Sequence, residues 1–219
     1  MLCQESQDRR FHPNRKKFWD FDYFKEVNTE QKAYWLGYWY GDGSSYKQDQ
    51  SSKEKLSSFD YGILPQFAID IQYTGSLDST EISFFGIEVL RLPPKPLRLY
   101  PEIDSGLHRH FDRGLFDADG SVSEFMVNGK WRNFFTTYTH ASSRLLTVVG
   151  QHIGTKLIPG HETWQLSVNG GGRVQQLGNY LYTGATRYMD RKIRVFRRAF
   201  DTATMRTLQP CFLPQSPGM

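Results

Sequence analysis

Residues 107–123, LHRHFDRGLFDADGSVS, decide the fold because residues 30–46, EQKAYWLGYWYGDGSSY, repeat their pattern. Aligned on the last glycine, both stretches read Gly-x-x-x-small-Asp-Gly-Ser. The matched pairs are Gly37 with Gly114, Gly41 with Ala118, Asp42 with Asp119, Gly43 with Gly120, and Ser44 with Ser121. A repeated stretch of this kind indicates a repeated structural unit, so we expect two related halves in the chain.

Each copy predicts an α-helix that runs directly into a β-strand. Asn28, followed by Gln31 three residues later, resembles a capping box and predicts the start of the first helix. Asp104 or Ser105 is a suitable N-cap for the second helix. The glycine after the last acid of each copy is predicted to end its helix in the left-handed conformation.

Small residues four positions apart give each predicted helix a narrow groove along one face. The pairs are Gly37 with Gly41 in the first copy and Gly114 with Ala118 in the second. Such a face lets two helix backbones approach closely, by analogy with small-xxx-small pairs in membranes. We therefore expect the two helices to pack on each other through these four residues.

Three acids lie near the predicted C-terminal ends of the helices: Asp42, Asp117 and Asp119. A helix carries partial negative charge at that end, so carboxylates there are unfavourable for stability. Local rules of this kind fail mostly at functional sites. The acids therefore indicate a functional site at the ends of the helices.

The rest of the chain predicts an α+β protein with unequal halves. In the second half, Asn128-Gly129 predicts a two-residue hairpin turn, in which residue 127 pairs with 130. A helix near 141–154, a second hairpin and a mostly helical segment to residue 200 follow, in the order αββαββα. The first half predicts a strand near 66–73 and a helix near 78–91, and it lacks the second hairpin. The predicted division is an N-terminal extension at 1–24, a shortened repeat at 25–92, a Pro-rich extended linker at 93–103, a full repeat at 104–205 and a tail at 206–219.

Composition bounds the class of protein. Of the 219 residues, 38% are hydrophobic, which is enough for a packed core. The sequence contains neither an apolar run that could span a membrane nor a secretory signal, so we expect an intracellular protein without a membrane partner. Cys3 and Cys211 lack metal-site spacing, and the six histidines form no catalytic pattern.

Charge divides the chain unevenly. Residues 1–104 hold 13 basic and 16 acidic residues, a net charge of −3, while residues 105–219 have a net charge of +7. A basic half is typical of proteins that bind polyanions such as nucleic acids, and it also occurs on ordinary protein surfaces.

Three segments together resemble the LAGLIDADG homing endonucleases, in the single-chain form with two motifs. TEQKAYWLGYWYGDG resembles the first motif of that family, and HFDRGLFDADGS resembles the second. NYLYTGATRYMDRKIRVF resembles the closing helix that such chains often carry. The resemblance covers residues 20–200, with the motifs in the expected order.

The resemblance implies that the motif helices form a pseudo-symmetric interface and that Asp42 and Asp119 meet at its end. Two adjacent carboxylates repel unless a cation lies between them. Mg²⁺, or another divalent cation, is therefore the implied cofactor, with the carbonyls of Gly41 and Ala118 as further ligands. Lys192 matches the family's basic residue near the active site, where it would either stabilise phosphate charge or contact the DNA backbone. Asp117 matches a position without a metal role and is expected to be structural or solvent-facing.

The strands after each motif are implied to form a saddle over DNA. Strand alternation separates a polar face from a core face. With residue 127 paired to 130, the predicted core face of the first hairpin includes Trp131 and Phe135. The predicted DNA-binding residues are Ser121, Ser123, Lys130, Arg132, Thr136 and Tyr138 in the first hairpin of the second half, Thr163 and Gln165 in its second hairpin, and Ser44, Tyr46 and Gln48 in the first half.

The leading functional hypothesis is a Mg²⁺-dependent, site-specific DNA endonuclease that binds double-stranded DNA as a monomer and makes a double-strand break. The alternative is a nucleic-acid-binding protein on the same fold that does not cleave: an intron maturase, an RNA-structural protein or a transcription factor. Both acids favour the nuclease, while the short first half, with 77 residues from Asp42 to Asp119, favours the binder. An organelle and a bacterial or phage cytoplasm are both consistent with the sequence.

Overall fold

The computed structural model describes residues 19–20, 22–48, 51–58, 60, 62–75, 81–85, 92–128 and 131–200. The helices are α1 (Glu30–Asp42), α2 (Ile63–Asp70), α3 (His108–Asp119), α4 (Ser143–Ile153), α5 (Gly171–Tyr182) and α6 (Asp190–Phe200), with short 3-10 turns η3 (Lys95–Leu97) and η4 (Ser105–Leu107). The strands are β1 (Gly43–Gln48), β2 (Ser51–Ser57), β3 (Glu81–Phe85), β4 (Gly120–Val127), β5 (Trp131–His140), β6 (Leu157–Pro159) and β7 (Trp164–Asn169). They form two antiparallel sheets, β1-β2-β3 and β4-β5-β7-β6, so the α+β class is confirmed.

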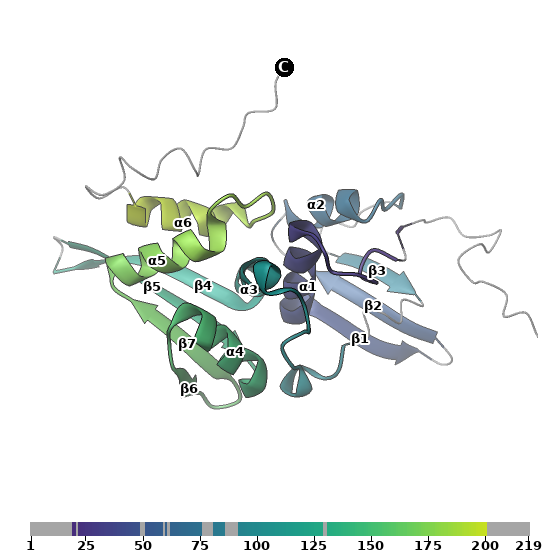
Figure 1. Ribbon diagram of the computed structural model, residues 1–219, viewed down its shortest axis with the longest axis horizontal. Helices are drawn as coiled ribbons and strands as arrows, with labels where there is room; N and C mark the ends of the chain where they lie inside the picture. Colours follow the sequence, from purple (N-terminus) through teal and green to yellow (C-terminus); the bar gives the residue numbers. More distant parts are fainter. Residues whose placement is uncertain are drawn as a thin grey trace, which may run out of the picture.

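Helices α1 and α3 pack against each other at the centre of the molecule, with one sheet on either side (Figure 1). A β-carbon on Gly37 would collide with the carbonyl of Phe111, and one on Gly114 would collide with the carbonyl of Tyr34. A β-carbon on Gly41 would collide with the side chain of Ala118. The predicted close approach of the two helices through these small residues is therefore confirmed.

The helix starts differ slightly from the predicted caps. Thr29, rather than Asn28, caps α1, and its hydroxyl accepts a hydrogen bond of 3.3 Å from the Lys32 amide. Asp104 accepts a hydrogen bond of 2.7 Å from the Gly106 amide and caps η4, which leads directly into α3. Thr29 satisfies the backbone of the first turn as well as asparagine would, because both side chains present a short oxygen acceptor.

The helix ends do not use the predicted left-handed glycines. Gly43 has φ −76° and Gly120 has φ −94°, so both are extended and already belong to the following strands. A β-carbon on Gly43 would instead meet the Trp39 carbonyl, and one on Gly120 would meet the Phe116 ring and carbonyl. Glycine is thus required here by the close approach of the backbone and not by a positive φ.

The β4–β5 hairpin has a register one residue away from the predicted one. Val127 pairs with Trp131, and residues 128–130 connect the strands, so the two-residue turn was a wrong prediction. Asn128 has φ 51°, the left-handed conformation that asparagine tolerates. Because side chains alternate along a strand, a slip of one residue moves every side chain of β5 to the opposite face.

The first half also differs from the prediction. The predicted strand near 66–73 falls mostly in α2, and β3 lies inside the predicted helix near 78–91, of which residues 78–80 and 86–91 lie outside the described residues. The buried apolar residues have helical spacing, and they are Ile63, Leu64, Phe67, Ala68 and Ile71. This period of three to four residues outweighs the β-branched composition that suggested a strand.

The second half follows the predicted order more closely. Ser142 caps α4, with its hydroxyl accepting a hydrogen bond of 3.2 Å from the Leu145 amide. The predicted helical segment is two helices, α5 and α6, and Gly184 in the connection between them has φ 67°, a left-handed conformation that glycine adopts readily. These two helices lie side by side over the β4–β7 sheet (Figure 1).

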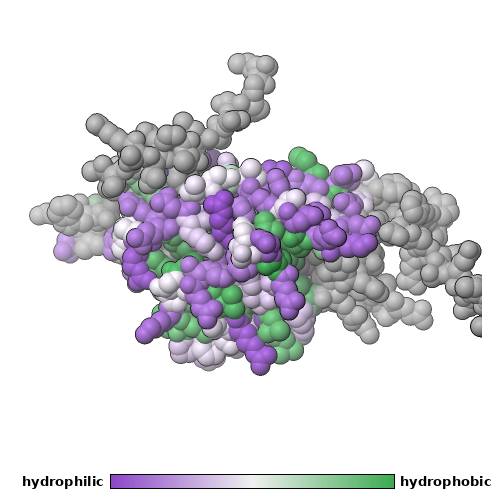
Figure 2. Space-filling model, in the orientation of Figure 1, coloured by the Kyte–Doolittle hydropathy of each residue, from purple (hydrophilic) through white to green (hydrophobic). Residues whose placement is uncertain are grey.

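The face of the described part that Figure 2 shows is mostly hydrophilic, with apolar residues between the polar ones. The core is rich in aromatic side chains, and Trp35, Trp39 and Phe116 are completely buried in it. Within the described residues, no helix has the length and hydropathy that crossing a lipid bilayer requires.

Candidate metal and nucleic-acid site

Helices α1 and α3 end side by side and bring Asp42 and Asp119 close together. A β-carbon on Gly41 would lie 3.3 Å from Cγ of Asp119, so the Asp119 carboxyl rests against the last turn of α1. The pKa of Asp119 is raised to about 6, mainly by burial, with Lys95 opposing the rise and the negative charge of Asp42 adding to it. The structure therefore places the two predicted metal acids in one electrostatic environment.

Asp42 is also partly withdrawn from water. Burial raises its pKa, and the Tyr38 hydroxyl, Lys95 and Lys192 oppose this rise. The Tyr38 hydroxyl also donates a hydrogen bond of 3.0 Å to the Ser58 hydroxyl. A carboxyl pair in this setting favours a bound cation, because added positive charge lowers the free energy of both ionised acids.

Basic residues surround Asp119. The Lys95 ammonium, half-exposed, lies 3.7 Å from Asp119 Oδ1. The buried His140 ring places Nε2 3.9 Å from Asp119 Oδ2. Arg98, also buried, lies close enough that Asp119 helps to keep its pKa high against the effect of burial.

The donor set fits Mg²⁺ better than a transition metal. Asp42 and Asp119 supply two carboxylates, and the described residues contain no cluster of three or more His, Cys, Asp or Glu side chains. Mg²⁺ takes one or two protein carboxylates and fills its shell with waters and phosphate oxygens. The carbonyls of Gly41 and Ala118 remain predicted ligands.

The Lys192 side chain is buried and fully hydrogen-bonded, unlike that of a lysine that is free to act in catalysis. Its ammonium is 1% exposed and donates to the carbonyls of Phe116, Asp117 and Gly120, each at 2.6 Å. Burial lowers its pKa to about 8, and the charge of Asp117 opposes this shift. With its three donors occupied, Lys192 holds the C-terminal end of α3 and so positions Asp119, while its predicted contact with phosphate stays a prediction.

Asp117 is completely buried, which excludes the solvent-facing alternative and confirms the structural one. Its carboxylate accepts hydrogen bonds from the Tyr34 hydroxyl at 3.0 Å and the Tyr182 hydroxyl at 2.6 Å. The Met189 amide adds a third hydrogen bond, at 2.8 Å. Asp117 therefore ties α1, α5 and the start of α6 to α3, and its charge faces the ammonium of Lys192.

Replacing Asp117 with Ala is expected to lower the free energy of unfolding by about 3–5 kcal/mol, because it leaves two buried hydroxyls and the Met189 amide without their acceptor and removes the charge that faces the buried Lys192 ammonium. Urea denaturation followed by circular dichroism measures this loss. Glu162→Ala, at an exposed position in the β6–β7 turn, is the control and should change stability by less than about 0.5 kcal/mol. A loss under about 1 kcal/mol for Asp117→Ala would contradict the structural role.

The outer face of the β4–β7 sheet, which we define as the side away from the helices, differs from the predicted DNA-binding face. Ser121 and Ser123 lie on it and are exposed, as predicted. Thr136 and Tyr138, each 1% exposed, lie on the core side, so their predicted DNA contacts were wrong. The cause is the register slip, which exchanges the two faces of β5 relative to β4.

The corrected register places other residues on the outer face. They are Phe125, Asn133, Phe135, Thr137, Thr139, Gln165 and Ser167, together with Ser121 and Ser123. The hydroxyls of Ser121 and Thr137 are hydrogen-bonded at 2.7 Å. Phe135 was therefore wrongly assigned to the core face, and Gln165 is confirmed on the outer one.

Several predicted DNA-binding positions are only partly described. Lys130 lies outside the described residues, and so does the side chain of Arg132. Thr163 lies in the β6–β7 turn, where its carbonyl accepts a hydrogen bond from the Gly160 amide. In the first sheet Ser44 is exposed, and register places positions 46 and 48 in phase with it, although the side chains of Tyr46 and Gln48 are outside the described part.

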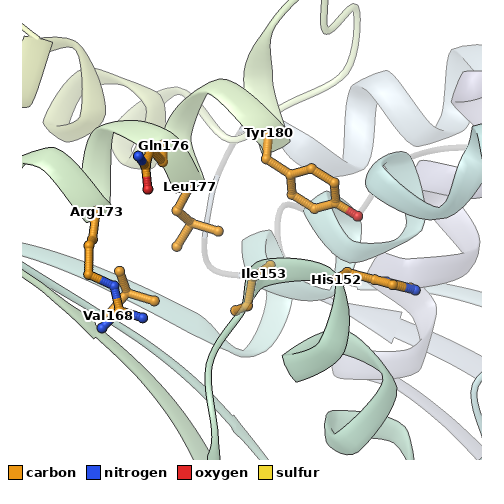
Figure 3. Close-up of a pocket in the computed structure, with 7 residues that line it drawn as sticks. All are labelled: His152, Ile153, Val168, Arg173, Gln176, Leu177 and Tyr180. Carbon is orange, nitrogen blue, oxygen red and sulfur yellow. The ribbon is translucent and has the colours of Figure 1, made fainter.

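A separate cavity of about 150 Å³ lies between α4 and α5, away from the acid pair (Figure 3). His152 and Tyr180 line one end of it, and both donate to buried Asp112, at 2.7 and 2.8 Å. The hydrogen bond from His152 raises the pKa of that imidazole. A hydrogen-bond network thus lies at the polar end of this cavity, and neither Asp42 nor Asp119 is among the residues that line it.

Sequence reasoning missed Lys95, Arg98 and His140. Two of them belong to a Pro-rich segment that was interpreted as a connector, and the third is the last residue of β5. The sequence KPLR (95–98) follows a pair of prolines and contains two basic residues. They could have indicated a role near the acids, because a simple connector does not require positive charge. No local pattern marks His140, since only the fold brings it to α1.

Comparisons with known proteins agree with this geometry. No protein-family model and no curated protein matches the sequence. The LAGLIDADG homing endonuclease I-GzeII in complex with its DNA target is similar in structure, with a TM-score of 0.53, 12% identity, and 83% of this chain and 92% of that chain covered. The LAGLIDADG meganuclease I-AabMI bound to uncleaved DNA gives a TM-score of 0.52, 8% identity and coverages of 76% and 87%. The meganuclease I-SmaMI bound to uncleavable DNA gives 0.52, 9%, 80% and 88%. This chain therefore has the fold of the LAGLIDADG homing endonucleases.

Proposed function

We propose that this protein is a divalent-metal-dependent DNA endonuclease of the homing type. The observation that carries the proposal is the meeting of Asp42 and Asp119 at the ends of two closely packed helices, where two acids destabilise the fold unless a cation binds. Structures with this fold include proteins whose descriptions name them endonucleases bound to DNA.

In the proposed mechanism, Asp42 and Asp119 would hold Mg²⁺, and the carbonyls of Gly41 and Ala118 would be further ligands. When bound, such an ion activates a water and stabilises the charge on the leaving oxygen of a phosphodiester. Lys192 holds the end of α3, which keeps the Asp119 carboxylate fixed. Lys95, the more exposed of the two lysines, has an ammonium that can reach a phosphate oxygen next to Asp119.

DNA would lie across the outer faces of the two sheets, which we propose belong to a shortened repeat (25–92) and a full repeat (104–205). Ser, Thr, Asn and Gln side chains on the β4–β7 sheet supply both donors and acceptors for base edges in the major groove. In the first sheet, Lys55 shares the outer face with Ser44, its partner across β1 and β2. The protein would bind as a monomer, because both acids come from one chain.

A second candidate function is nucleic-acid binding without cleavage, as in an intron maturase, an RNA-structural protein or a transcription factor. Among the described residues, the first sheet has three strands where the second has four. Among the described side chains on the outer face of the β4–β7 sheet, none is charged. Both features reduce the surface that could hold a long duplex.

The deciding experiment incubates the protein with Mg²⁺ and a plasmid that carries the sequence flanking its own gene, joined without the intron. Cutting at one position, giving a linear product with staggered ends, is the expected result. A set of plasmids with shuffled flanks serves as the control for specificity. Retained binding of the intron RNA, with every plasmid left intact, would overturn the nuclease and support the binding protein.

A further inference from the structure

The linker (93–103), together with Leu92 just before it, contacts the surroundings of the acid pair. The Leu92 amide donates a hydrogen bond of 3.3 Å to the Ser45 hydroxyl at the start of β1. Three residues further, Lys95 reaches Asp119. Arg98, which follows η3, is only 3% exposed. Arginine side chains are rarely buried unless they are paired.

The Arg98 guanidinium binds the C-terminal end of α1. Its Nη1 donates to the Tyr40 carbonyl, and its Nη2 donates to the Gly43 carbonyl at 3.1 Å. Its Nε donates to the Pro93 carbonyl at 3.1 Å, which fixes the linker around it. Tyr40 and Gly43 flank Asp42 on either side, so the guanidinium fork sets the path of the backbone that carries this acid.

A closed ring of hydrogen bonds joins this fork to the second half. The Ser142 hydroxyl donates to the Arg98 carbonyl at 2.6 Å, and the Ser142 amide donates to His140 Nδ1 at 2.9 Å. His140 Nδ1 is therefore the acceptor, and Nε2 carries the proton and faces the Tyr40 carbonyl at 3.3 Å. Tyr40 thus receives both Arg98 and His140, which lie at opposite corners of the ring.

A buried basic side chain binds the C-terminal end of each motif helix, and the two side chains come from different parts of the chain. Lys192 from α6 satisfies the last carbonyls of α3, and Arg98 from the linker does the same for α1. A helix C-terminus has unpaired carbonyls and partial negative charge, which an adjacent acid makes worse. One buried cation at each end offsets this charge without occupying the acids themselves.

We propose that Arg98 is a positioning residue for Asp42, and that the linker is consequently a working part of the acid site and not a passive connector. Arg98, Ser142 and His140 fix the end of α1 relative to β5 and α4, which sets the distance between the two acids. The expected effect of Arg98 on DNA cutting rests on the proposed function. Its role in holding the end of α1 rests only on the hydrogen-bond ring.

The test is Arg98→Lys, which keeps the charge but cannot form a fork to three carbonyls. We expect the duplex Kd to change less than threefold, the single-turnover cutting rate to fall by roughly 10–100-fold, and the Mg²⁺ midpoint to rise about tenfold, as for other residues that orient metal ligands. In the absence of DNA and metal, hydrogen exchange of the amides at 40–44 should become faster. Arg173→Lys, in which the exposed Arg173 loses a weak contact of 3.4 Å to the Gly154 carbonyl, is the matched control and should match the wild type in each measurement.

A wild-type rate, Mg²⁺ midpoint and exchange profile in Arg98→Lys would overturn the inference. If that variant does not fold, Ser142→Gly opens the ring at a smaller cost, because glycine is tolerated at an N-cap, and it should show the same changes in smaller measure. Wild-type behaviour of Ser142→Gly would then overturn the inference. A wild-type protein that cuts no DNA contradicts the proposed function instead, and the exchange measurement still decides the role of Arg98.

Discussion

Asp119→Asn is expected to reduce DNA cutting by roughly three orders of magnitude, while the Kd for the duplex changes by less than about threefold. Loss of one of two carboxylates removes several kcal/mol of metal-dependent stabilisation from the transition state, and each 1.36 kcal/mol is a factor of ten in rate. Binding is retained because the duplex contacts the sheets, and the acid pair meets only the phosphates at the cut. Single-turnover cleavage and a fluorescence binding assay measure the two effects separately.

Asp190→Asn is the matched control, because the Asp190 carboxylate is exposed at the start of α6 and pairs with Arg194 one turn further along the same helix. It should cut DNA at the wild-type rate. Cutting by Asp119→Asn within about tenfold of the wild type would exclude this acid from the metal site.

Asp119→Asn also has an effect on stability that depends on pH. The pKa of Asp119 is raised from an ordinary 3.8 to about 6, so between these values the folded state binds more protons than the unfolded state. Wild-type stability therefore falls as pH rises through this window. Asn does not titrate, so without metal Asp119→Asn should be more stable than wild type by about 2–3 kcal/mol above pH 6, and this gain should vanish below pH 4. Thermal unfolding at both pH values measures it, and an equal gain at both would contradict the raised pKa.

Gly114→Ala is expected to lower the free energy of unfolding by at least about 3 kcal/mol and to leave much of the chain unfolded. The new methyl group would meet the Tyr34 carbonyl and the Tyr38 amide, which are backbone atoms of α1 and cannot move without separating the helices. Overpacking costs about 1–3 kcal/mol even where side chains can yield, so a rigid backbone neighbour makes the cost higher.

Gly172→Ala provides the control for this substitution, because Gly172 lies in α5 with open space around its α-carbon. Replacing a helical glycine by alanine there should stabilise the protein by about 0.5–1 kcal/mol. Urea denaturation of both variants decides between the two effects. A Gly114→Ala protein that unfolds at the wild-type urea concentration would show that α1 and α3 do not meet as closely as described.

The central helix pair could be predicted from sequence because its signal is repeated. Gly37 and Gly114 occupy matched places in two similar stretches, and only a close approach of backbones requires a glycine in the middle of each helix. The acids followed from the same alignment, since Asp42 and Asp119 have to meet if their helices pack in register.

The register of the β4–β5 hairpin could not be predicted, because Asn128-Gly129 fits a two-residue turn as well as the start of a longer one. The choice between them depends on packing in the folded protein, which buries Phe134 and places Tyr138 against Phe116 of α3. The predicted contacts of Thr136 and Tyr138 with DNA were wrong for this one reason.

The surroundings of the acids were beyond sequence reasoning for a different cause. Arg98 lies 58 residues from Tyr40, and His140 lies 100 residues from it, yet both contact its carbonyl. Contacts across such separations depend on the complete fold. Lys192 was correctly placed near the motif ends by the resemblance, but only the structure shows its ammonium bound to three carbonyls of the α3 end.

The most direct test of the acid site is the position of Mn²⁺, located by its anomalous scattering in crystals of the protein with the duplex that it cuts. We expect a peak between the two motif helices, within about 2.5 Å of carboxylate oxygens of both Asp42 and Asp119, with a phosphate oxygen completing the shell. A duplex bound without any peak between these acids, with the Lys95 ammonium still beside Asp119, would contradict the proposal that the two acids hold the metal.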